Sequence, residues 1–337
     1  MKHPTVQGTF VGNRSNAVVE LMLDRRTRHG TSPVTAADGR KLALIVEGGG
    51  MRGVLSAGAL LALDILGFRA VFDEVYATSA GAVNAAYFLS GQGAYGITIY
   101  FDDISNRRFI NPLRFWKMVD IGFVYDKVVP VIKPLDEPAL RAQPAKLFFS
   151  VTDIETGGNR LLDVKNLEEP ISQMLKATSA LPVLYNRTVT VDGRAYIDGG
   201  ASCTLPIVQA AQRGCTDILV LMTKAPDYRS EPPTRLRKAI LYWALGRVYP
   251  KIMEAYAILD ARNQSDRALA AGINAVEPVN VATLFPTDDE LIVNRTTIDR
   301  RKLILGAERM AVRTAGLLGE DAGRVRSAFA RYQRDPR

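Results

Sequence analysis

The chain has 337 residues, 47% of them hydrophobic, and a formal net charge of +8. This length and apolar content can bury a large core and favour one large α/β domain over two domains of equal rank. The only cysteines, Cys203 and Cys215, exclude a disulfide framework and a cluster with zinc spacing. The positive charge favours anionic partners such as acidic phospholipid or nucleic acid, although such an excess is more often a solvated surface.

Residues 1–40 are polar and basic, and we expect an arm with a short helix near residues 18–23 that packs on the main domain. The first residues lack the apolar core of a signal peptide, and no run of about 18 apolar residues occurs in the chain. We therefore expect a cytoplasmic protein whose contact with a bilayer, if it has any, is peripheral.

A strand, a glycine-rich turn and a helix are predicted over residues 42–66. Residues 42–46 form a continuous apolar run, typical of a strand buried on both faces. From Val54 to Ile65, apolar or small residues recur every three or four positions, which predicts a helix. The turn between them consists of Glu47, Gly48, Gly49, Gly50, Met51, Arg52 and Gly53. Its free N–H groups can hold an anion, either a bound phosphate or the transient oxyanion of acyl transfer.

Ser79 stands alone between a second predicted strand, residues 72–78, and a second predicted helix, residues 80–89. A nucleophile elbow places its serine at such a junction. Ala77 replaces the usual first glycine of the G-x-S-x-G pattern, and Gly81 supplies the second. The alternative is that Ser79 only caps the helix that follows it.

The segment of residues 91–144 is irregular, and residues 106–117 within it mix aromatic and basic side chains. We favour surface helices packed around the sheet, with Phe109, Phe115 and Trp116 in the core. The alternative is a basic and aromatic rim that seats the protein on lipid headgroups.

Further strands are predicted at residues 146–152, 160–164 and 217–223, with a helix around residues 171–177. An Asp-Gly pair at residues 192–193 predicts a hairpin of residues 188–197. The second arm of this hairpin ends in Asp198, Gly199 and Gly200, which places a carboxylate at a strand end among small residues. Beyond Pro232, residues 236–269 are predicted to be mostly helical.

A serine nucleophile needs a base. The two histidines, His3 and His29, both precede Ser79, whereas the histidine of an α/β-hydrolase follows its nucleophile. The base should therefore be a carboxylate, with Asp198 as first choice and Asp153 as second. Burial would raise its pKa and make it a better base. By itself, Asp198 could equally be only a turn residue.

Three motifs follow one another in the chain: Gly48-Gly49-Gly50-Met51-Arg52-Gly53, Thr78-Ser79-Ala80-Gly81 and Asp198-Gly199-Gly200. In this order they resemble the patatin-like phospholipase family, over roughly residues 40–225. The segments 153–157 and 177–182 also look similar to parts of that family. The resemblance implies an α/β fold, a three-layer α/β/α sandwich with a mainly parallel central sheet, here with a helical C-terminal extension.

The resemblance also implies a mechanism. Ser79 would be the nucleophile, and Asp198 the base that activates first Ser79 and then water. The N–H groups of the loop from Gly48 to Gly53 would form the oxyanion hole, and Arg52 would orient that loop. Small residues would support the elbow and the turn: Ala77, Gly81, Gly199 and Gly200. The reaction would need no metal and no other cofactor.

We expect an N-terminal arm at residues 1–40, a catalytic core at residues 41–225 and a mostly helical region at residues 226–337 packed on the core. The expected function is hydrolysis of fatty-acyl esters of lipids or phospholipids, with peripheral contact to an anionic membrane and no nucleic-acid partner. The alternatives are an acyltransferase that uses the same dyad and a catalytically weak lipid-binding or regulatory protein. Nucleotide binding is disfavoured, because the glycine turn lacks the Gly-Lys-Ser/Thr ending of a P-loop and no acidic ribose partner follows it.

Overall fold

The computed structural model describes residues 12, 15–29, 38–111, 113–114, 118–181, 185, 187–229, 234, 239, 242–243, 247, 249–276 and 278–334. Some predictions concern positions outside these ranges. These positions are the first residues of the arm, His3, Phe115, Trp116 and Pro232.

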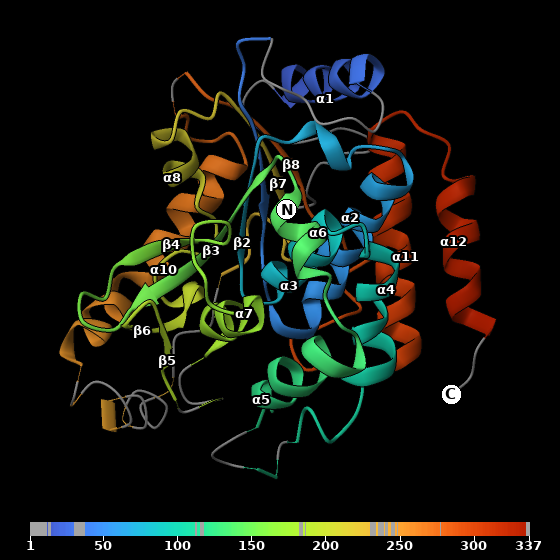
Figure 1. The fold of residues 1–337 in the computed structure, drawn as a ribbon. Coiled ribbons are helices and arrows are strands. Elements are labelled where there is room, and N and C mark those ends of the chain that lie inside the picture. The colour runs from blue at the N-terminus through green and yellow to red at the C-terminus, as the bar shows by residue number, and fades with distance from the viewer. Residues whose placement is uncertain are drawn as a thin grey trace, which may run out of the picture.

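A mixed sheet of eight strands lies at the centre of the fold (Figure 1). Its strands are β1 (Leu42–Val46), β2 (Glu74–Thr78), β3 (Lys146–Asp153), β4 (Asn159–Asp163), β5 (Val189–Val191), β6 (Arg194–Asp198), β7 (Asp217–Leu221) and β8 (Asn280–Leu284). Following the hydrogen-bonded pairs, the strands connect as β5-β6-β3-β2-β1-β7-β8, and β4 also pairs with β3. The five strands from β3 to β8 in this order are parallel, whereas β4 and β6 run antiparallel to β3 and β5 runs antiparallel to β6.

Helices cover both faces of this sheet. The α-helices are α1 (Ser15–His29), α2 (Gly53–Ile65), α3 (Ala80–Leu89), α4 (Gly93–Gly96), α5 (Ile121–Phe123), α6 (Glu137–Ala142), α7 (Ile171–Ser179), α8 (Ile207–Gln212), α10 (Pro250–Ala270), α11 (Arg300–Leu317) and α12 (Gly323–Arg334). Short 3₁₀ or π segments are η1 (Gly50–Arg52), η2 (Arg69–Val71), η3 (Ile99–Asp103), η4 (Val124–Ile132) and η5 (Gly199–Ala201).

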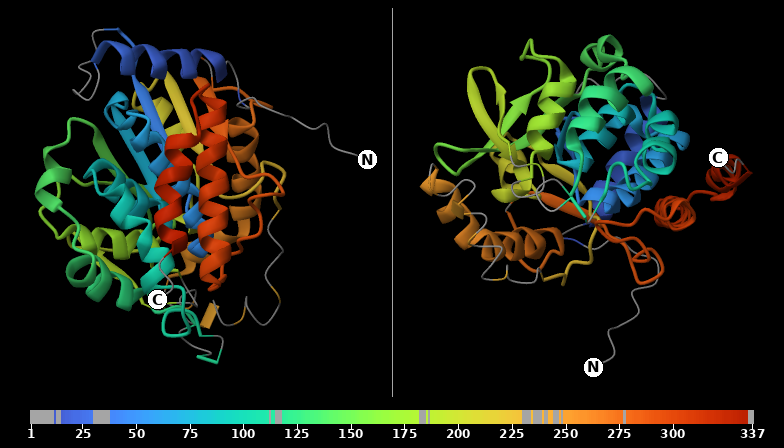
Figure 2. Two further views of the ribbon diagram at one scale, coloured as in Figure 1. Left: turned by 90° about the vertical axis from the view of Figure 1, so that its right-hand side faces the viewer. Right: turned by 90° about the horizontal axis from the view of Figure 1, so that it is seen from below.

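Side chains of β1 alternate between two hydrophobic cores, as period-2 geometry requires. Leu44 and Val46 belong to the core shared with α2, α3 and α11, whereas Ala43 and Ile45 belong to the core shared with α8 and α10. The apolar run of residues 42–46 is therefore buried on both faces, as predicted. Figures 1 and 2 show these helices on opposite sides of the sheet, which confirms the three-layer α/β/α sandwich with a mainly parallel centre.

The C-terminal region supplies more than a helical cover. The predicted helical extension is present as α10, α11 and α12. The same region also supplies β8, which pairs in parallel with β7 and extends the central sheet beyond residue 225. Helix α11 approaches α2 so closely that a Cβ on Gly58 would lie 2.2 Å from the carbonyl oxygen of Ala307. The division of the chain at residue 225 stays a prediction.

Helix α1 crosses the sheet at the amino ends of its parallel strands (Figure 1). Arg25 of α1 donates hydrogen bonds to the carbonyls of Val71 and Arg40, both at 2.8 Å, and forms an ion pair with Asp73 at 2.7 Å. These partners lie just before β2 and β1. The carboxyl ends of the parallel strands are at the other end of the molecule. Among the described helices, none combines the length and apolar character needed to cross a bilayer.

Candidate active site

Ser79 lies at the junction of β2 and α3 in a strained conformation. Its φ and ψ are 56° and −127°, and besides Asp192 it is the only non-glycine residue in the described ranges with a positive φ. Such strain at a strand-to-helix turn is typical of a nucleophile elbow. The side chain of Ser79 makes no capping hydrogen bond to α3, so helix capping does not explain why serine occupies this position.

The backbone around Ser79 leaves no space for larger residues. A Cβ on Gly48 would lie 2.4 Å from the carbonyl oxygen of Thr78, and one on Gly81 would lie 2.5 Å from that of Val46. Ala77, in contrast, fits within β2 and is buried in the core. The replacement of the first elbow glycine by alanine is therefore accommodated in the strand.

A neighbouring strand end brings Asp198 to Ser79. On β3, Ser150 pairs with Thr78 of β2, and the next residue, Val151, pairs with Asp198 of β6. Because β4 occupies the opposite edge of β3, β2 and β6 must use the same edge in succession. The carboxyl ends of β2 and β6 therefore meet, and Ser79 follows directly after this meeting point.

The carboxyl group of Asp198 is only 2% exposed. Its Oδ1 accepts a hydrogen bond from the N–H of Gly200 at 2.7 Å, whereas Oδ2 is buried and makes no hydrogen bond of good geometry within the described residues. Burial raises the pKa of Asp198 to about 6, against the opposing effects of the Ser79 hydroxyl, the Gly200 N–H and the positive charges of Arg295 and Lys224. At neutral pH this group is a carboxylate that is more basic than an ordinary aspartate and has one oxygen still able to accept a proton.

Asp153, the second candidate base, is engaged elsewhere. Its Oδ1 accepts hydrogen bonds from the N–H groups of Glu155 and Thr156, and its Oδ2 forms ion pairs with Arg160 and Arg194. These contacts close the turn after β3, so we assign Asp153 a structural role. The backbone of His29 ends α1, which lies at the amino ends of the parallel strands, whereas Ser79 follows the carboxyl end of β2. Within the described residues, no group of three or more His, Cys, Asp or Glu side chains could hold a metal ion.

The glycine-rich loop lies directly against the elbow. Gly49 and Gly50 take φ values of 150° and 61°, which favour glycine. The last three N–H groups of the loop already have acceptors: Met51 donates to the carbonyl of Arg295 (3.1 Å), Arg52 to that of Gly49 (3.3 Å) and Gly53 to that of Gly50. In the described part of the chain, the N–H groups of Gly48, Gly49 and Gly50 have no protein acceptor. The candidate oxyanion donors thus narrow from six residues to these three.

A model of the patatin-like phospholipase family matches residues 44–211, about half of the chain and the part that carries the loop, Ser79 and Asp198. The chain belongs to the patatin-like phospholipase family. This is a family of lipid acyl hydrolases. The chain is similar to YjjU of Escherichia coli strain K12, with 29% identity over 189 residues, and to YqhO of Bacillus subtilis strain 168, with 25% identity over 256 residues.

These alignments do not span whole proteins. The match to YjjU covers 54% of this chain and about half (52%) of YjjU, and the match to YqhO covers 66% of this chain and 83% of YqhO. Both relatives are described as uncharacterized proteins. The crystal structure of VipD from Legionella pneumophila superimposes with a TM-score of 0.39 and 14% identity, over 82% of this chain and 66% of that one.

In this member of the patatin-like family, a buried ion cluster lies beneath the glycine-rich loop. Glu47, the residue before Gly48, accepts hydrogen bonds from Lys224 at 2.9 Å, from Arg267 of α10 at 2.5 Å and from the N–H of Thr223 at 2.7 Å. Burial acts to raise the pKa of Glu47, but the two cations and the Thr223 N–H outweigh it and lower the pKa to about 2. The cluster ties the start of the loop to β7 and to the C-terminal helix α10.

We expect Glu47→Gln to lower the free energy of unfolding by roughly 3–5 kcal/mol, because it leaves two buried cations without their carboxylate. Urea denaturation at neutral pH measures this loss. The same substitution at Glu254, which is 65% exposed and pairs with Lys251 on the surface, is the matched control and should change stability by about 0.5 kcal/mol or less. Equal losses in the two variants would contradict a stabilising role for the buried cluster.

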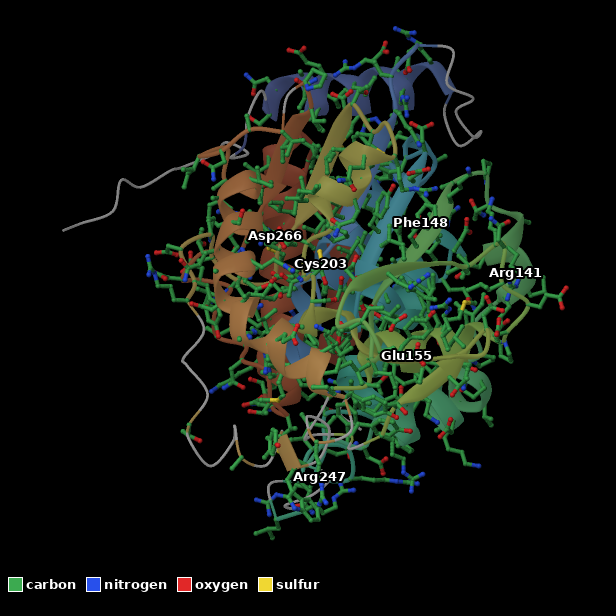
Figure 3. All side chains as sticks on the ribbon, turned by 90° about the vertical axis from the view of Figure 1, so that its left-hand side faces the viewer. Arg141, Phe148, Glu155, Cys203, Arg247 and Asp266 are labelled. Atoms are coloured by element: carbon green, nitrogen blue, oxygen red, sulfur yellow. The ribbon has the colours of Figure 1, made fainter. Side chains whose placement is uncertain are left out.

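Several residues around the site were missed by the sequence analysis. Glu47 and Lys224 could have been predicted from the sequence, because each is a charged residue just beyond a predicted buried strand. Arg267 and Arg295 lie far along the chain and carry no local signal. Helix α10 also holds the turn after Asp198, where Arg262 donates to the carbonyl of Ser202 at 2.8 Å. Figure 3 shows Asp266 of the same helix beside Cys203, whose Sγ lies 3.9 Å from the Asp266 carboxylate.

Proposed function

We propose that this protein hydrolyses fatty-acyl esters of lipids, phospholipids included, with Ser79 as nucleophile and Asp198 as base. The observation that supports this most strongly is the buried Asp198, which has a raised pKa and feels the Ser79 hydroxyl, and whose Oδ2 makes no hydrogen bond of good geometry within the described residues. It stands at a strand end that meets the elbow of Ser79. A carboxylate in this position can accept the proton of a serine hydroxyl directly.

The reaction follows from these positions. Ser79 Oγ attacks the ester carbonyl carbon while Asp198 takes its proton, and the N–H groups of Gly48, Gly49 and Gly50 stabilise the oxyanion. The intermediate then collapses as Asp198 returns the proton to the departing alcohol, which leaves an acyl-serine. Asp198 next removes a proton from water, which attacks the acyl group, and the fatty acid departs as Ser79 regains its hydrogen.

A fluorophosphonate probe tests the nucleophile. We expect the folded protein to be phosphonylated at Ser79, with fluoride as the leaving group, because the probe reacts with activated serines. Digestion and mass spectrometry locate the modified residue. Heat-denatured protein should remain unlabelled, and Asp198→Asn should label much more slowly. Modification at another serine, or none in a folded sample, would contradict the proposal.

Peripheral contact with an anionic membrane is part of the same proposal. Leu113 is 88% exposed and Trp243 is 78% exposed, and aromatic and aliphatic side chains of this kind enter the bilayer interface. Arg247, close to Trp243 in the chain, lies at the end of the molecule opposite α1 (Figure 3). The carboxyl ends of the parallel strands, where Ser79 lies, face that same end.

A further inference from the structure

Positive charges converge on the candidate active site from three parts of the chain. Arg52 belongs to the glycine-rich loop, Lys224 follows β7, and Arg295 precedes α11. The charges of Arg295 and Lys224 both act on the carboxylate of Asp198. The guanidinium of Arg52 and the ammonium of Lys224 each lie 5.3 Å from the ring centre of Tyr228.

Two of these cations lack an anion. Lys224 pairs with Glu47, as does Arg267. Within the described residues, neither Arg52 nor Arg295 forms an ion pair with a carboxylate, and the Nε of Arg52 is buried without a hydrogen-bond partner. Burial, followed by the charge of Arg295, lowers the pKa of Arg52, against the opposing effects of Tyr228 and Glu47. A largely buried guanidinium beside a second positive charge is stabilised when an anion joins the two.

Arg295 lies on the glycine-rich loop itself. Its carbonyl accepts the N–H of Met51 at 3.1 Å, and a Cβ on Gly50 would lie 3.1 Å from its Cγ. Its side chain therefore begins beside the N–H groups proposed to bind the oxyanion. Arg295 is an exposed residue, so a ligand that enters from solvent can reach it.

We propose that Arg295, together with Arg52, forms a subsite for an anionic group, a phosphate or a carboxylate, carried by the acyl ester that Ser79 attacks. This inference rests on the proposed function and names its substrate class as anionic acyl esters. Guanidinium groups suit the role because they bind both kinds of oxyanion with paired hydrogen bonds. Arg295 lies outside the residues that match the family, so this part of the subsite belongs to the C-terminal region of this chain.

Equilibrium binding to the Ser79→Ala variant tests the subsite without turnover. Two soluble ligands that differ only in the charged group are dibutyrylglycerol 3-phosphate and dibutyrylglycerol. We expect the phosphate ester to bind more tightly in calorimetry at constant ionic strength, and adding Arg295→Gln should reduce this preference about tenfold, the usual effect of losing one charge-assisted contact. Arg301→Gln is the matched control. Arg301 is an exposed arginine of α11, and its substitution removes the same charge. It should leave the preference unchanged.

Equal binding of the two ligands, or a preference that survives Arg295→Gln, would overturn the subsite. Inorganic phosphate and glycerol 3-phosphate distinguish the source of the anion. Binding of either one as tight as that of the phosphate ester would show a site for a free phosphate and overturn the assignment to an acyl ester, whereas much weaker binding supports a lipid headgroup. Hydrolysis of dibutyrylglycerol 3-phosphate and of dibutyrylglycerol by the wild-type protein is measured separately. Failure to hydrolyse either one, with the binding preference intact, would remove the proposed function and leave the anion subsite standing.

Discussion

Ser79→Ala should reduce hydrolysis of p-nitrophenyl butyrate by roughly 10⁴-fold or more, because the substitution removes the atom that forms the acyl-enzyme. The side chain of Ser79 makes no capping bond to α3, and its backbone is held independently by the hydrogen bond from its N–H to Thr178 Oγ1 at 3.0 Å. The fold should therefore persist, with a melting temperature within a few degrees of the wild type. Release of p-nitrophenolate at saturating ester gives the rate.

Ser90→Ala is the control for this result. Ser90 follows the same helix at its other terminus, where its hydroxyl can donate either to the carbonyl of Tyr87 or to Gln92 Oε1. We expect its activity to stay close to that of the wild type. Substantial turnover in folded Ser79→Ala would show that another group attacks the ester, and the elbow would then need a different explanation.

Local sequence patterns predicted the elements that carry the candidate nucleophile, Ser79. The apolar run before the glycine-rich loop, the helical spacing after Gly53 and the lone serine between a strand and a helix each lie in one short stretch of sequence. The elements β1, α2, β2 and α3 appear where these patterns lie. The hairpin before Asp198 was also predictable, because Asp192 and Gly193 both take the positive φ that the turn needs.

Long-range pairing was beyond such patterns. The succession of β2 and β6 along one edge of β3 brings Asp198 beside Ser79, but it depends on a strand register that neither segment contains. The contact between Glu47 and Arg267 spans 220 positions in the chain. Strand β8 was missed although Pro278 and Pro286 bracket its short apolar run in the sequence, and its parallel pairing with β7 is what shows it to be a strand.

The C-terminal region therefore contacts the candidate active site although it lies outside the family match. It provides Arg267 to the cluster under the loop, Arg295 to the surface of the loop and Arg262 to the turn after Asp198. A catalytic core cut at residue 225 would lose all three contacts and the edge strand β8. We expect the site to need this region for its geometry.

Asp198→Asn should reduce hydrolysis by about 10²–10⁴-fold, because an amide cannot accept the proton of Ser79. In the wild type, kcat/KM for p-nitrophenyl butyrate should rise with pH through about 6 and then level off, since the carboxylate with a pKa of about 6 is the active form. The residual activity of the variant should lack this rise. Stopped-time assays across the acid range measure both profiles. A wild-type profile that rises near pH 4 instead would indicate a base of ordinary pKa.

The same substitution should stabilise the folded protein at neutral pH. The pKa of Asp198 is raised from 3.8 to about 6, so between these pH values the folded state binds more protons than the unfolded state, and wild-type stability from this group falls as pH rises. Above about pH 6 this loss of stability is complete and amounts to about 3 kcal/mol.

The asparagine of Asp198→Asn cannot ionise, and its side-chain oxygen can still accept the Gly200 N–H. The gain in unfolding free energy of Asp198→Asn, measured by urea denaturation, should therefore be small near pH 4, grow toward pH 6 and then stay constant. A gain that does not change over this range would mean that Asp198 is not held as a costly buried carboxylate. Loss of activity combined with gain of stability is the result that a structural turn residue would not produce.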